Sequence, residues 1–340
     1  MTNPNRFPNG FALHPPPAAK SPLTRAVSRL ITTLVNSHPR FGHTPALLLA
    51  LLCCARLAAA EAFRVATYNL ESYLDQPTET RPAKLPAAKA KVRESILALK
   101  PDVLALQEMG STNALLELRD SLKADGLDLP YWEHVSGSDT NIHIAILSRF
   151  PLTARRPHAD DSFLSSGRRF RVSRGFAEVD VQVNAIYSFT LIAAHLKSRR
   201  AIAQADEAEL RLEEAKLLRE KVDDRLAADP NANLIVLGDL NDNKDSASIK
   251  ALVGRGKHKL VDTRPAERNG DHPSSREPRN VAWTHYYAKE DSYSRIDYIL
   301  LSPGMAREWL TNETYVLTLP DWGVGSDHRP IVATFQAEDH

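Results

Sequence analysis

Cysteine is almost absent from this 340-residue sequence, which has only Cys53 and Cys54. Both lie in the first sixty residues, a segment that we expect to be missing from the mature protein for the reasons given below. Residues 61–340 contain no thiol, so a cysteine nucleophile, a cysteine zinc site, an iron–sulfur cluster and a disulfide are all excluded there. Any chemistry in residues 61–340 must use other side chains.

Long hydrophobic runs are also scarce. The one candidate, Ala46–Leu52, is too short to span a bilayer, which takes roughly 20 apolar residues. Basic residues before it and an Ala58-x-Ala60 pattern after it are typical of a secretory signal cleaved before Glu61. We therefore expect residues 1–60 to be a signal or targeting segment and the mature protein to be secreted or periplasmic. Because the lead is long for a signal, a start codon placed too far upstream and an organellar transit peptide are the alternatives.

Acidic residues are missing from the first sixty positions, which contain six basic ones. Removing those six from the 43 Lys and Arg leaves 37 against 42 Asp and Glu, a net charge of about −5 for residues 61–340. The composition is otherwise that of a soluble globular protein, with 43% hydrophobic and 25% charged residues. This excludes a mainly disordered, collagenous or polytopic membrane protein.

Short apolar segments rich in Val, Ile and aromatic residues recur along the chain and predict strands. They are Phe63–Leu70, Asp102–Gln107, His143–Ser148, Phe176–Val183, Ser188–Leu196, Leu234–Leu237, Ile296–Leu301 and Ile331–Phe335. Two segments with helical spacing, Ala87–Leu99 and Ala201–Ala228, each end beside a proline and lead into a strand. Since no linker or repeat interrupts them, residues 61–340 are predicted to form one domain, a mixed α/β sandwich.

Polar side chains stand at the ends of these predicted strands and in the loop before the last one. They are Asn69, Glu71, Glu108, His195, Lys197, Asp239, Asn241, Asp297, Asp327 and His328. Period-two alternation places Asn69 with Glu71 on one face, and Asp239 with Asn241 on another. Because sheet proteins gather ligands at strand ends, we expect these side chains to converge.

Five of these side chains are carboxylates, those of Glu71, Glu108, Asp239, Asp297 and Asp327. Two like charges 4 Å apart repel by roughly 1 kcal/mol in water and about 4 kcal/mol at an effective dielectric of 20. Such a cluster stays ionised only if cations compensate it. Oxygen and amide ligands favour a hard cation, Mg²⁺ first and Mn²⁺ or Ca²⁺ next. Zinc is disfavoured because no His-x-x-x-His or Cys pattern is present.

The same segments, in this order, resemble the endonuclease/exonuclease/phosphatase superfamily. Its members include deoxyribonuclease I, apurinic endonucleases, neutral sphingomyelinases and inositol-polyphosphate 5-phosphatases. The resemblance runs from Phe63 to Phe335 and rests on six motifs, among them Gly238-Asp-Leu-Asn241 and Ser326-Asp-His328. It implies a four-layer αββα sandwich of two packed mixed β-sheets flanked by helices, with the active site at one edge of the sheets.

The resemblance also implies roles for the metal and water ligands. Glu108 resembles the principal Mg²⁺ ligand, with Asn69 and Asp327 near the same ion. Asp239 and Asn241 resemble the pair that positions the attacking water and holds the scissile phosphate. Taken alone, each amide would be an ordinary strand-end cap, and Glu108 a solvated strand end.

Two histidines complete the expected catalytic set. His328, oriented by Asp297, resembles the imidazole that acts as acid–base catalyst or stabilises the phosphate. His195 resembles a second histidine, which deoxyribonuclease-like members use on the leaving-group side. The implied reaction is hydrolysis of a phosphate ester by in-line attack of water. The remaining candidates, His134, His143 and His285, are expected to be structural or surface residues.

The substrate is less well indicated than the reaction. Basic residues cluster before one strand and after another, namely Arg168, Arg169, Arg171, Arg174, Lys197, Arg199 and Arg200. If they line the pocket, they form a track for a nucleic-acid backbone; otherwise they are a solvated face. We expect a secreted, monomeric nuclease or phosphodiesterase acting on DNA or RNA, without a stable protein partner.

Three alternatives stay open. A sphingomyelinase-like enzyme would need an exposed apolar hairpin, and the candidates Trp309 and Trp322 are isolated in the sequence. A small-molecule phosphatase depends on pocket loops that the sequence does not reveal. A catalytically silent binding module on this fold would usually lack a metal ligand or the terminal histidine, and both are present.

Overall fold

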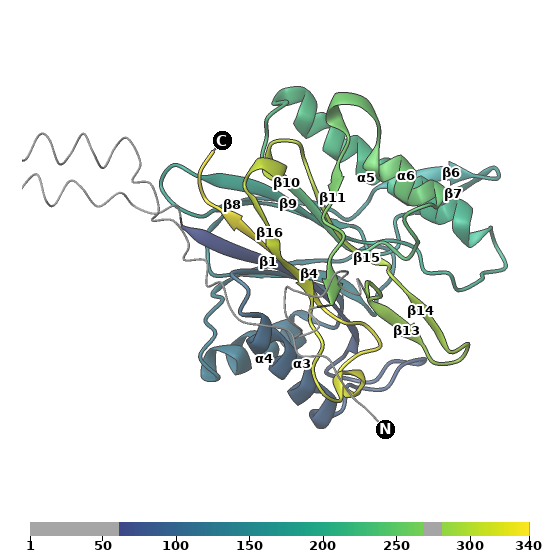
Figure 1. Ribbon diagram of the computed structural model, residues 1–340. Helices are drawn as coiled ribbons and strands as arrows, with labels where there is room; N and C mark the ends of the chain where they lie inside the picture. Colours follow the sequence, from purple (N-terminus) through teal and green to yellow (C-terminus); the bar gives the residue numbers. More distant parts are fainter. Residues whose placement is uncertain (1–60, 268–280, 340) are drawn as a thin grey trace, which may run out of the picture. The chain divides into compact units, whose positions relative to one another are not determined.

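The computed structural model describes residues 61–267 and 281–339, which form two β-sheets packed face to face between two layers of helices (Figure 1). This confirms the expected four-layer αββα sandwich. The expected signal segment, residues 1–60, lies outside the described residues. Within the described ranges, no helix is both long and apolar enough to cross a membrane.

The first sheet contains seven strands in the order β12-β16-β17-β1-β2-β4-β3. They are β1 (Ala62–Tyr73), β2 (Val103–Met109), β3 (Tyr131–Val135), β4 (His143–Ser148), β12 (Ala266–Glu267), β16 (Trp309–Val316) and β17 (Ile331–Gln336). β1 runs parallel to β2 and antiparallel to β17. The C-terminal ends of β1 and β2 therefore meet the N-terminal end of β17 at one edge of the sheet.

The second sheet contains six strands in the order β11-β15-β10-β9-β8-β5. They are β5 (Leu152–His158), β8 (Phe176–Gln182), β9 (Ser188–His195), β10 (Leu234–Asp239), β11 (Val261–Asp262) and β15 (Asp297–Leu301). β10 runs parallel to β9 and antiparallel to β15. Its register places Asp239 opposite both His195 and Asp297, so three predicted site residues stand side by side at one edge.

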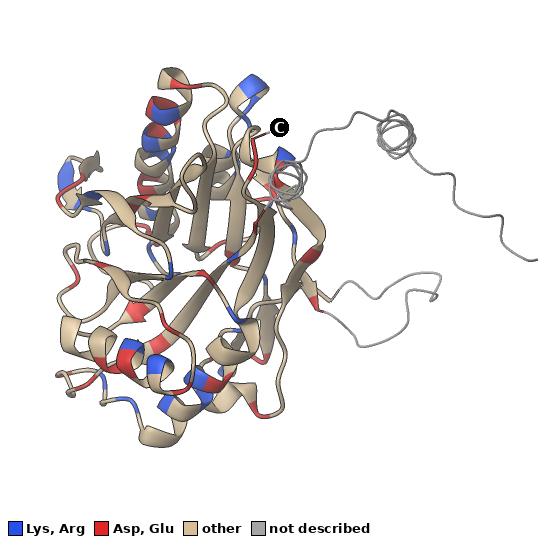
Figure 2. Ribbon diagram, turned by 90° about the vertical axis from the view of Figure 1, so that its left-hand side faces the viewer, with Lys and Arg blue, Asp and Glu red and all other residues tan. Residues whose placement is uncertain are grey.

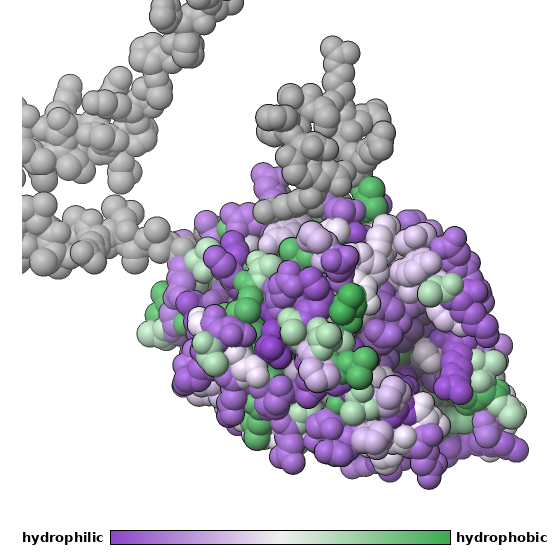
Figure 3. Space-filling view, turned by 90° about the horizontal axis from the view of Figure 1, so that it is seen from below, coloured by the Kyte–Doolittle hydropathy of each residue, from purple (hydrophilic) through white to green (hydrophobic). Residues whose placement is uncertain are grey.

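Helices cover the outer face of each sheet. α3 (Pro86–Leu99) and α4 (Thr112–Ala124) pack on the first sheet, and α5 (Glu207–Ala228) and α6 (Ala247–Val253) on the second. Charged residues are frequent on these outer helices, whereas most residues of the strands between them are uncharged (Figure 2). Seen from below, the side that carries α3 and α4 is mainly hydrophilic, with apolar residues in small separate groups (Figure 3). Three one-turn helices complete the set: η1 (Gly256–His258), η2 (Met305–Arg307) and η3 (Trp322–Val324).

The central core lies between the two sheets. Phe63 of β1 stacks on Phe189 of β9 and on Phe335 of β17, with ring centroids 5.2 and 5.6 Å apart. Because central strands such as β2 and β10 are buried on both faces, their sequences are continuous apolar runs rather than alternating ones. Two further apolar layers separate the sheets from their helices, and this packing fixes the strand ends on which the site is built.

All eight strands predicted from the sequence are present, but several elements differ from expectation, and β16, which lies between β12 and β17, was not predicted. The helix expected from Ala201 begins at Glu207, because the Asp206 side chain accepts the backbone N–H groups of Ala208 and Glu209 and caps the helix there. Helices α4 and α6 were not expected. Nor were two hairpins, β6 (Ser162–Ser165) with β7 (Arg168–Arg171) and β13 (His285–Tyr287) with β14 (Ser292–Ser294).

Candidate active site

The structure brings the five predicted catalytic residues together around Asp239, at the edge that is on the right in Figure 1. Asp239 is buried, and its Oδ2 accepts a 2.9 Å hydrogen bond from Asn69 Nδ2 of the other sheet. The same oxygen lies 3.4 Å from His195 Nε2 and 3.7 Å from His328 Nε2. One carboxylate thus faces an amide and two imidazoles contributed by three other segments.

Burial raises the pKa of Asp239 to about 7, and the charge of Asp297 adds to the rise while His328 opposes it. Removing a carboxylate from water disfavours its charged form. Asp239 therefore exchanges a proton near neutral pH, which suits a group that assists an attacking water.

His328 is oriented by Asp297, as predicted. Its Nδ1 lies 2.9 Å from Asp297 Oδ2, and the Thr284 hydroxyl accepts the backbone N–H of Asp297 at 3.2 Å. Burial disfavours the imidazolium, but the charges of Asp297 and Asp239 outweigh burial and hold the pKa of His328 well above its usual value. His328 is thus a buried cation that points its Nε2 at Asp239.

His195 has the opposite character. Full burial, followed by the positive charge of Arg174, holds the pKa of His195 well below its usual value, so the ring is neutral at pH 7. Its Nδ1 is buried without a hydrogen-bond partner among the described residues. Arg174 is itself buried and donates from Nη1 to Leu196 O at 3.3 Å, which places a guanidinium beside His195.

Asn241 is held next to Asp239 by the backbone. Its N–H donates to Asp239 Oδ1 and its Nδ2 to Leu196 O, each at 2.9 Å, with φ of 55°. Gly238 makes the approach possible, because its φ is 132° and a Cβ there would lie 1.9 Å from Ala194 O. The Gly238-Asp-Leu-Asn241 motif is therefore required by the backbone conformation as well as by the chemistry of its side chains.

The carboxylates of Glu71, Glu108 and Asp327 form a second group, in which the charges of Asp327 and Glu108 both act on Glu71. Burial, then the charge of Asp327 and also that of Glu108, raises the pKa of Glu71, while Lys84 opposes the rise. The Lys84 ammonium donates to Glu71 O at 3.0 Å. A cation bound among these carboxylates would relieve their repulsion.

Glu108 is not free to turn. Its Oε2 accepts hydrogen bonds from the Ser72 N–H and hydroxyl at 3.0 and 3.1 Å and pairs with Arg81 Nη1 at 3.1 Å. Glu71, Ser72 and Glu108 all have positive φ, from 47° to 58°, and the ladder between β1 and β2 shifts register after Asn69. Period-two alternation therefore breaks down after Asn69 and does not determine the face on which Glu71 lies.

The predicted magnesium ligands fit a hard divalent cation in chemical type. Glu108 and Asp327 offer carboxylate oxygens, and none of the three predicted ligands offers sulfur. Asn69 turns Nδ2 toward Asp239, so only Oδ1, which already accepts the Glu71 N–H at 3.0 Å, remains for an ion. By proximity alone, two other groups could hold a metal ion: His285 with Asp327 and His328, and Asp239 with Asp297 and His328.

His285, expected to be structural or on the surface, belongs to the site. It forms a β-bridge with His328, their rings lie 4.6 Å apart, and its Nε2 is 3.6 Å from Asp327 Oδ2. Hydrogen bonding to His285, and the charge of His328, overcome the effect of burial and lower the pKa of Asp327. The only sequence signal for His285 is the aromatic density of Trp283–Tyr287, which does not identify it as a site residue.

Helix α5 holds two loops of the site. Glu214 is buried and accepts the N–H groups of Ser173 at 2.9 Å and Lys197 at 2.6 Å. Arg211 Nη1 donates to Lys197 O at 3.0 Å, and its Nε pairs with Asp242 at 3.0 Å. The residues that follow His195 and Asn241 are thereby fixed to one helix.

The basic cluster predicted from the sequence is divided in the structure. Arg168, Arg169 and Arg171 are exposed on β7, whereas Arg174 is buried beside His195. The Lys197 ammonium bonds to carbonyl groups of its own loop, including Arg200 O at 2.9 Å. Only part of the cluster is therefore available to a nucleic-acid backbone.

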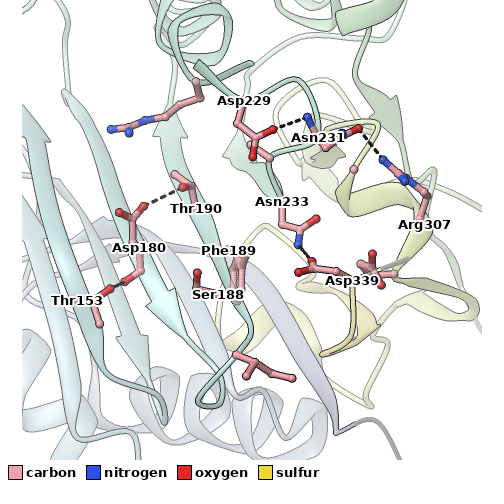
Figure 4. Close-up of a pocket in the computed structure, with 15 residues that line it drawn as sticks. Thr153, Asp180, Ser188, Phe189, Thr190, Asp229, Asn231, Asn233, Arg307 and Asp339 are labelled. Carbon is pink, nitrogen blue, oxygen red and sulfur yellow. Dashed lines mark hydrogen bonds between the residues drawn. The ribbon is translucent and has the colours of Figure 1, made fainter. Parts of the chain in front are cut away.

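A pocket of about 610 Å³ lies away from these residues. It is lined by Ser188 at the start of β9 and by Asn233 just before β10, the opposite ends of the strands that deliver His195 and Asp239. Several of its polar side chains are paired with one another, as in the bonds from Arg307 to Asn231 and from Asn233 to Asp339 (Figure 4). We do not assign the reaction to this pocket.

Comparison with known proteins identifies the architecture. The model of the Endonuclease/Exonuclease/phosphatase family matches residues 66–328, which contain every predicted site residue. No curated protein sequence matches the chain significantly.

Solved structures share the fold at low sequence identity. Truncated TDP2 from Caenorhabditis elegans superimposes with a TM-score of 0.54 at 20% identity, covering 81% of this chain and 98% of that one. Sphingomyelinase C from Streptomyces griseocarneus gives a TM-score of 0.54 at 20% identity, covering 81% and 100%. An endonuclease/exonuclease/phosphatase from Bacteroides vulgatus gives 0.56 at 15% identity, covering 82% and 100%. At these identities the similarity establishes the fold and no more.

Proposed function

Because the chain belongs to the endonuclease/exonuclease/phosphatase family, we propose that it is a metal-dependent phosphodiesterase that cleaves nucleic acid. One observation carries the proposal: the Asp239 carboxylate lies between a cationic His328 and a neutral His195 and accepts a hydrogen bond from Asn69. A base poised near pH 7 next to a fixed positive charge suits attack of water on an anionic phosphate ester.

Each residue takes a role consistent with its protonation. Asp239 accepts a proton from the attacking water, and Asn241 fixes the Asp239 carboxylate from the backbone side. His328 neutralises charge that develops on the phosphoryl oxygens, and Asp297 keeps it protonated. When bound by Glu108, Asn69 and Asp327, Mg²⁺ would act as a Lewis acid toward a phosphoryl oxygen.

His195 is assigned a supporting role. Because it is neutral at pH 7, it can donate only one N–H, and its Nε2 is the nitrogen near Asp239. The adjacent Arg174 supplies the positive charge on that side of the site. We therefore propose that His195 orients Asp239 or the leaving group by hydrogen bonding instead of carrying a permanent charge.

Nucleic acid is the preferred substrate over lipid because of the exposed positive charges and the hydrophilic surface. Arg168 and Arg169 are exposed on the hairpin β6–β7, which, like β13–β14, projects on the right of Figure 1. Exposed cations of this kind bind phosphate backbones. Lipid cleavage is the second candidate, favoured by the fold shared with sphingomyelinase C. The hydrophilic face in Figure 3 offers little support for insertion into a membrane interface.

The test is hydrolysis by the full chain of plasmid DNA, single-stranded DNA, sphingomyelin and bis-p-nitrophenyl phosphate, with Mg²⁺, Mn²⁺, Ca²⁺ or EDTA. Metal-dependent cleavage of DNA and of the small diester, lost in Glu108→Ala, is the expected result. Cleavage of sphingomyelin alone would replace the nuclease assignment with the lipid one. Turnover of phosphomonoesters alone would contradict both.

Secretion, the monomeric state and the identity of the ion are parts of the same proposal. The Ala58-x-Ala60 pattern supports cleavage before Glu61. Sequencing the N-terminus of protein recovered from the medium or periplasm would test it, with Glu61 expected as the first residue. Intact Met1 in a cytosolic fraction would show that the segment is not a signal.

A further inference from the structure

The hairpin β13–β14 stands directly against the catalytic loop. Besides the bridge from His285 to His328, the Tyr286 N–H donates to Asp327 O at 3.0 Å and the Arg329 N–H to Thr284 O at 2.6 Å. The first strand of the hairpin is therefore joined to the backbone on both sides of His328. A ligand that touches this strand lies beside the reacting phosphate.

The two faces of the hairpin carry different residues. Strand alternation puts His285 and Tyr287 on one face, and Tyr286 with its cross-strand partner Tyr293 on the other. On the second face, Tyr293 stacks on Tyr286 at 4.8 Å and meets the edge of Trp283 at 4.9 Å. Those rings support each other, and Trp283 also packs on Trp322. Trp322 is therefore part of a cluster, contrary to its isolation in the sequence.

On the first face, the rings of His285 and Tyr287 lie in a row that starts at the catalytic His328. His285 lies 4.6 Å from His328, and Tyr287 follows His285 with a centroid distance of 6.3 Å and an angle of 22° between their planes. The three rings form a series that leads from the buried catalytic imidazole to the 40% exposed side chain of Tyr287. The described residues place no other aromatic ring within stacking distance of Tyr287.

We propose that Tyr287, backed by His285, is a stacking subsite for an unpaired nucleobase next to the scissile phosphate. The proposal rests on the proposed phosphodiesterase function and names its substrate class: single-stranded nucleic acid, or duplex ends with unpaired bases. A base inside a duplex has both faces occupied by its neighbours, so it has no face to offer Tyr287. An unpaired base has one, and aromatic side chains bind such bases with little sequence preference.

The composition of this face favours a base over an acyl chain. Ser294 and Ser292 lie directly opposite His285 and Tyr287 in the hairpin register, so the rings are bordered by hydroxyl groups. Hydroxyl groups can hydrogen-bond the polar edge of a base, whereas an acyl chain would leave them unpaired. An interfacial lipid site would instead need a continuous apolar surface.

The test compares Tyr287→Ala with Tyr287→Phe and with Tyr293→Ala in the full chain. Tyr293→Ala is the matched control, because it removes an equal ring from the opposite face of the same hairpin. Binding of a fluorescein-labelled ten-nucleotide oligothymidine is measured by anisotropy in EDTA, and KM is measured with Mg²⁺ for the same oligonucleotide and for sphingomyelin.

Tyr287→Ala is expected to raise Kd and KM for the oligonucleotide roughly 5- to 150-fold, the range for losing one base stack. Tyr287→Phe should bind like the wild type, because the ring is kept. Tyr293→Ala should keep the Kd and KM of the wild type for the oligonucleotide. An abasic oligonucleotide should bind the wild type as weakly as the thymidine oligonucleotide binds Tyr287→Ala.

Equal losses in Tyr287→Ala and Tyr293→Ala would show that the rings only stabilise the hairpin, which overturns the stacking subsite. Unchanged oligonucleotide binding in Tyr287→Ala would overturn it as well, and an effect on sphingomyelin alone would assign the ring to lipid. Because binding is measured without hydrolysis, an inactive wild type that still binds through Tyr287 would contradict the proposed function and leave the subsite standing.

Discussion

Among its acidic neighbours, Asp297 acts most strongly on the charge of His328, and its Oδ2 lies 2.9 Å from His328 Nδ1. Replacing Asp297 with Asn keeps the size of the side chain and removes the charge that raises the pKa of His328 above its ordinary value. The raised pKa keeps the His328 imidazolium present at neutral pH. Without Asp297 the pKa of His328 is lower, so the imidazolium loses its proton at a lower pH. Asp297→Asn should therefore shift the alkaline limb of the pH profile of kcat to lower pH. On that limb, kcat should fall about tenfold for each unit by which the pKa of His328 is lowered.

The pH profile of hydrolysis of bis-p-nitrophenyl phosphate measures this shift, with an NMR titration of the His328 ring as the independent readout. A uniform drop in kcat at every pH, with the His328 resonance unmoved, would mean that Asp297 positions the ring without setting its charge.

Among the residues, the sequence predicted which side chains gather and the pairing of His328 with Asp297, but not the contacts of Asp239 with Asn69 and the two histidines. Asp239, Asn241, Asp297 and His328 were recognisable because each ends or precedes an apolar strand in a known order. His285 was not, since its role comes from a bridge to His328 across 43 residues of chain. The left-handed backbone at Glu71 also has no signature, because Glu, unlike Gly, gives no sign of positive φ.

Among the elements, α5 links the outer layer to the site through Glu214. Glu214→Gln keeps one acceptor oxygen but turns an amide toward one of the two N–H donors, Ser173 or Lys197. The N–H group of one loop then loses its hydrogen-bond acceptor, which costs about 1–3 kcal/mol. If this loss is expressed in the position of the loop, kcat/KM should fall roughly 5- to 150-fold. The neighbouring Glu213→Gln is the control, because Glu213 pairs only with Lys216 on the surface.

Steady-state kinetics and thermal unfolding together separate two explanations for Glu214. If Glu214→Gln lowers the melting temperature but the folded fraction keeps wild-type kcat/KM, the residue stabilises the fold without positioning the loops.

The edge strand β5 is tied to β8 and α5 by another buried carboxylate. Burial alone would raise the pKa of Glu178, but hydrogen bonds from His158 and Arg156 and the charges of Arg156 and Arg225 lower it to about 2. Because this value lies below the ordinary 4.5, the stabilisation is complete above pH 4.5 and is lost as the pH falls toward 2. Glu178→Gln should therefore lower the free energy of unfolding at pH 7 by about 3 kcal/mol.

Urea unfolding between pH 2 and pH 7 checks this prediction. The Glu178→Gln variant should lose less stability on acidification than the wild type, while Asp120→Asn, which breaks an exposed pair with Arg119, should behave like the wild type. Parallel stability curves for Glu178→Gln and the wild type would show that the ion pairs add nothing.

Element boundaries followed from local signals only where those signals were strong. The prolines after Leu99 and Ala228 ended their helices as expected. The hairpin β13–β14 was missed because its strands have three residues each and mix Tyr with Ser and His, so no apolar alternation marks them. Its position is set by tertiary contact with the catalytic loop, which no local pattern encodes.

For the whole molecule, the strongest prediction was the fold itself. Eight apolar strands separated by few helices are too many for a single covered sheet, and packing two sheets buries both faces of the central strands. What the composition could not reveal is the division of charge within the site: carboxylates gather near Glu108, whereas a cationic His328 and a neutral His195 lie beside Asp239. That division depends on the register of both sheets at one edge.

The role of Asp239 as the base is tested by the rate at which the full chain hydrolyses bis-p-nitrophenyl phosphate with Mg²⁺ and with EDTA, for the wild type and Asp239→Asn. Asn keeps the shape of Asp239 but cannot accept the proton of the attacking water. The wild type should hydrolyse the diester only with the metal, and Asp239→Asn should be slower by about 10²–10⁴-fold at unchanged stability. Metal-independent turnover, or a folded Asp239→Asn with the wild-type rate, would contradict the account.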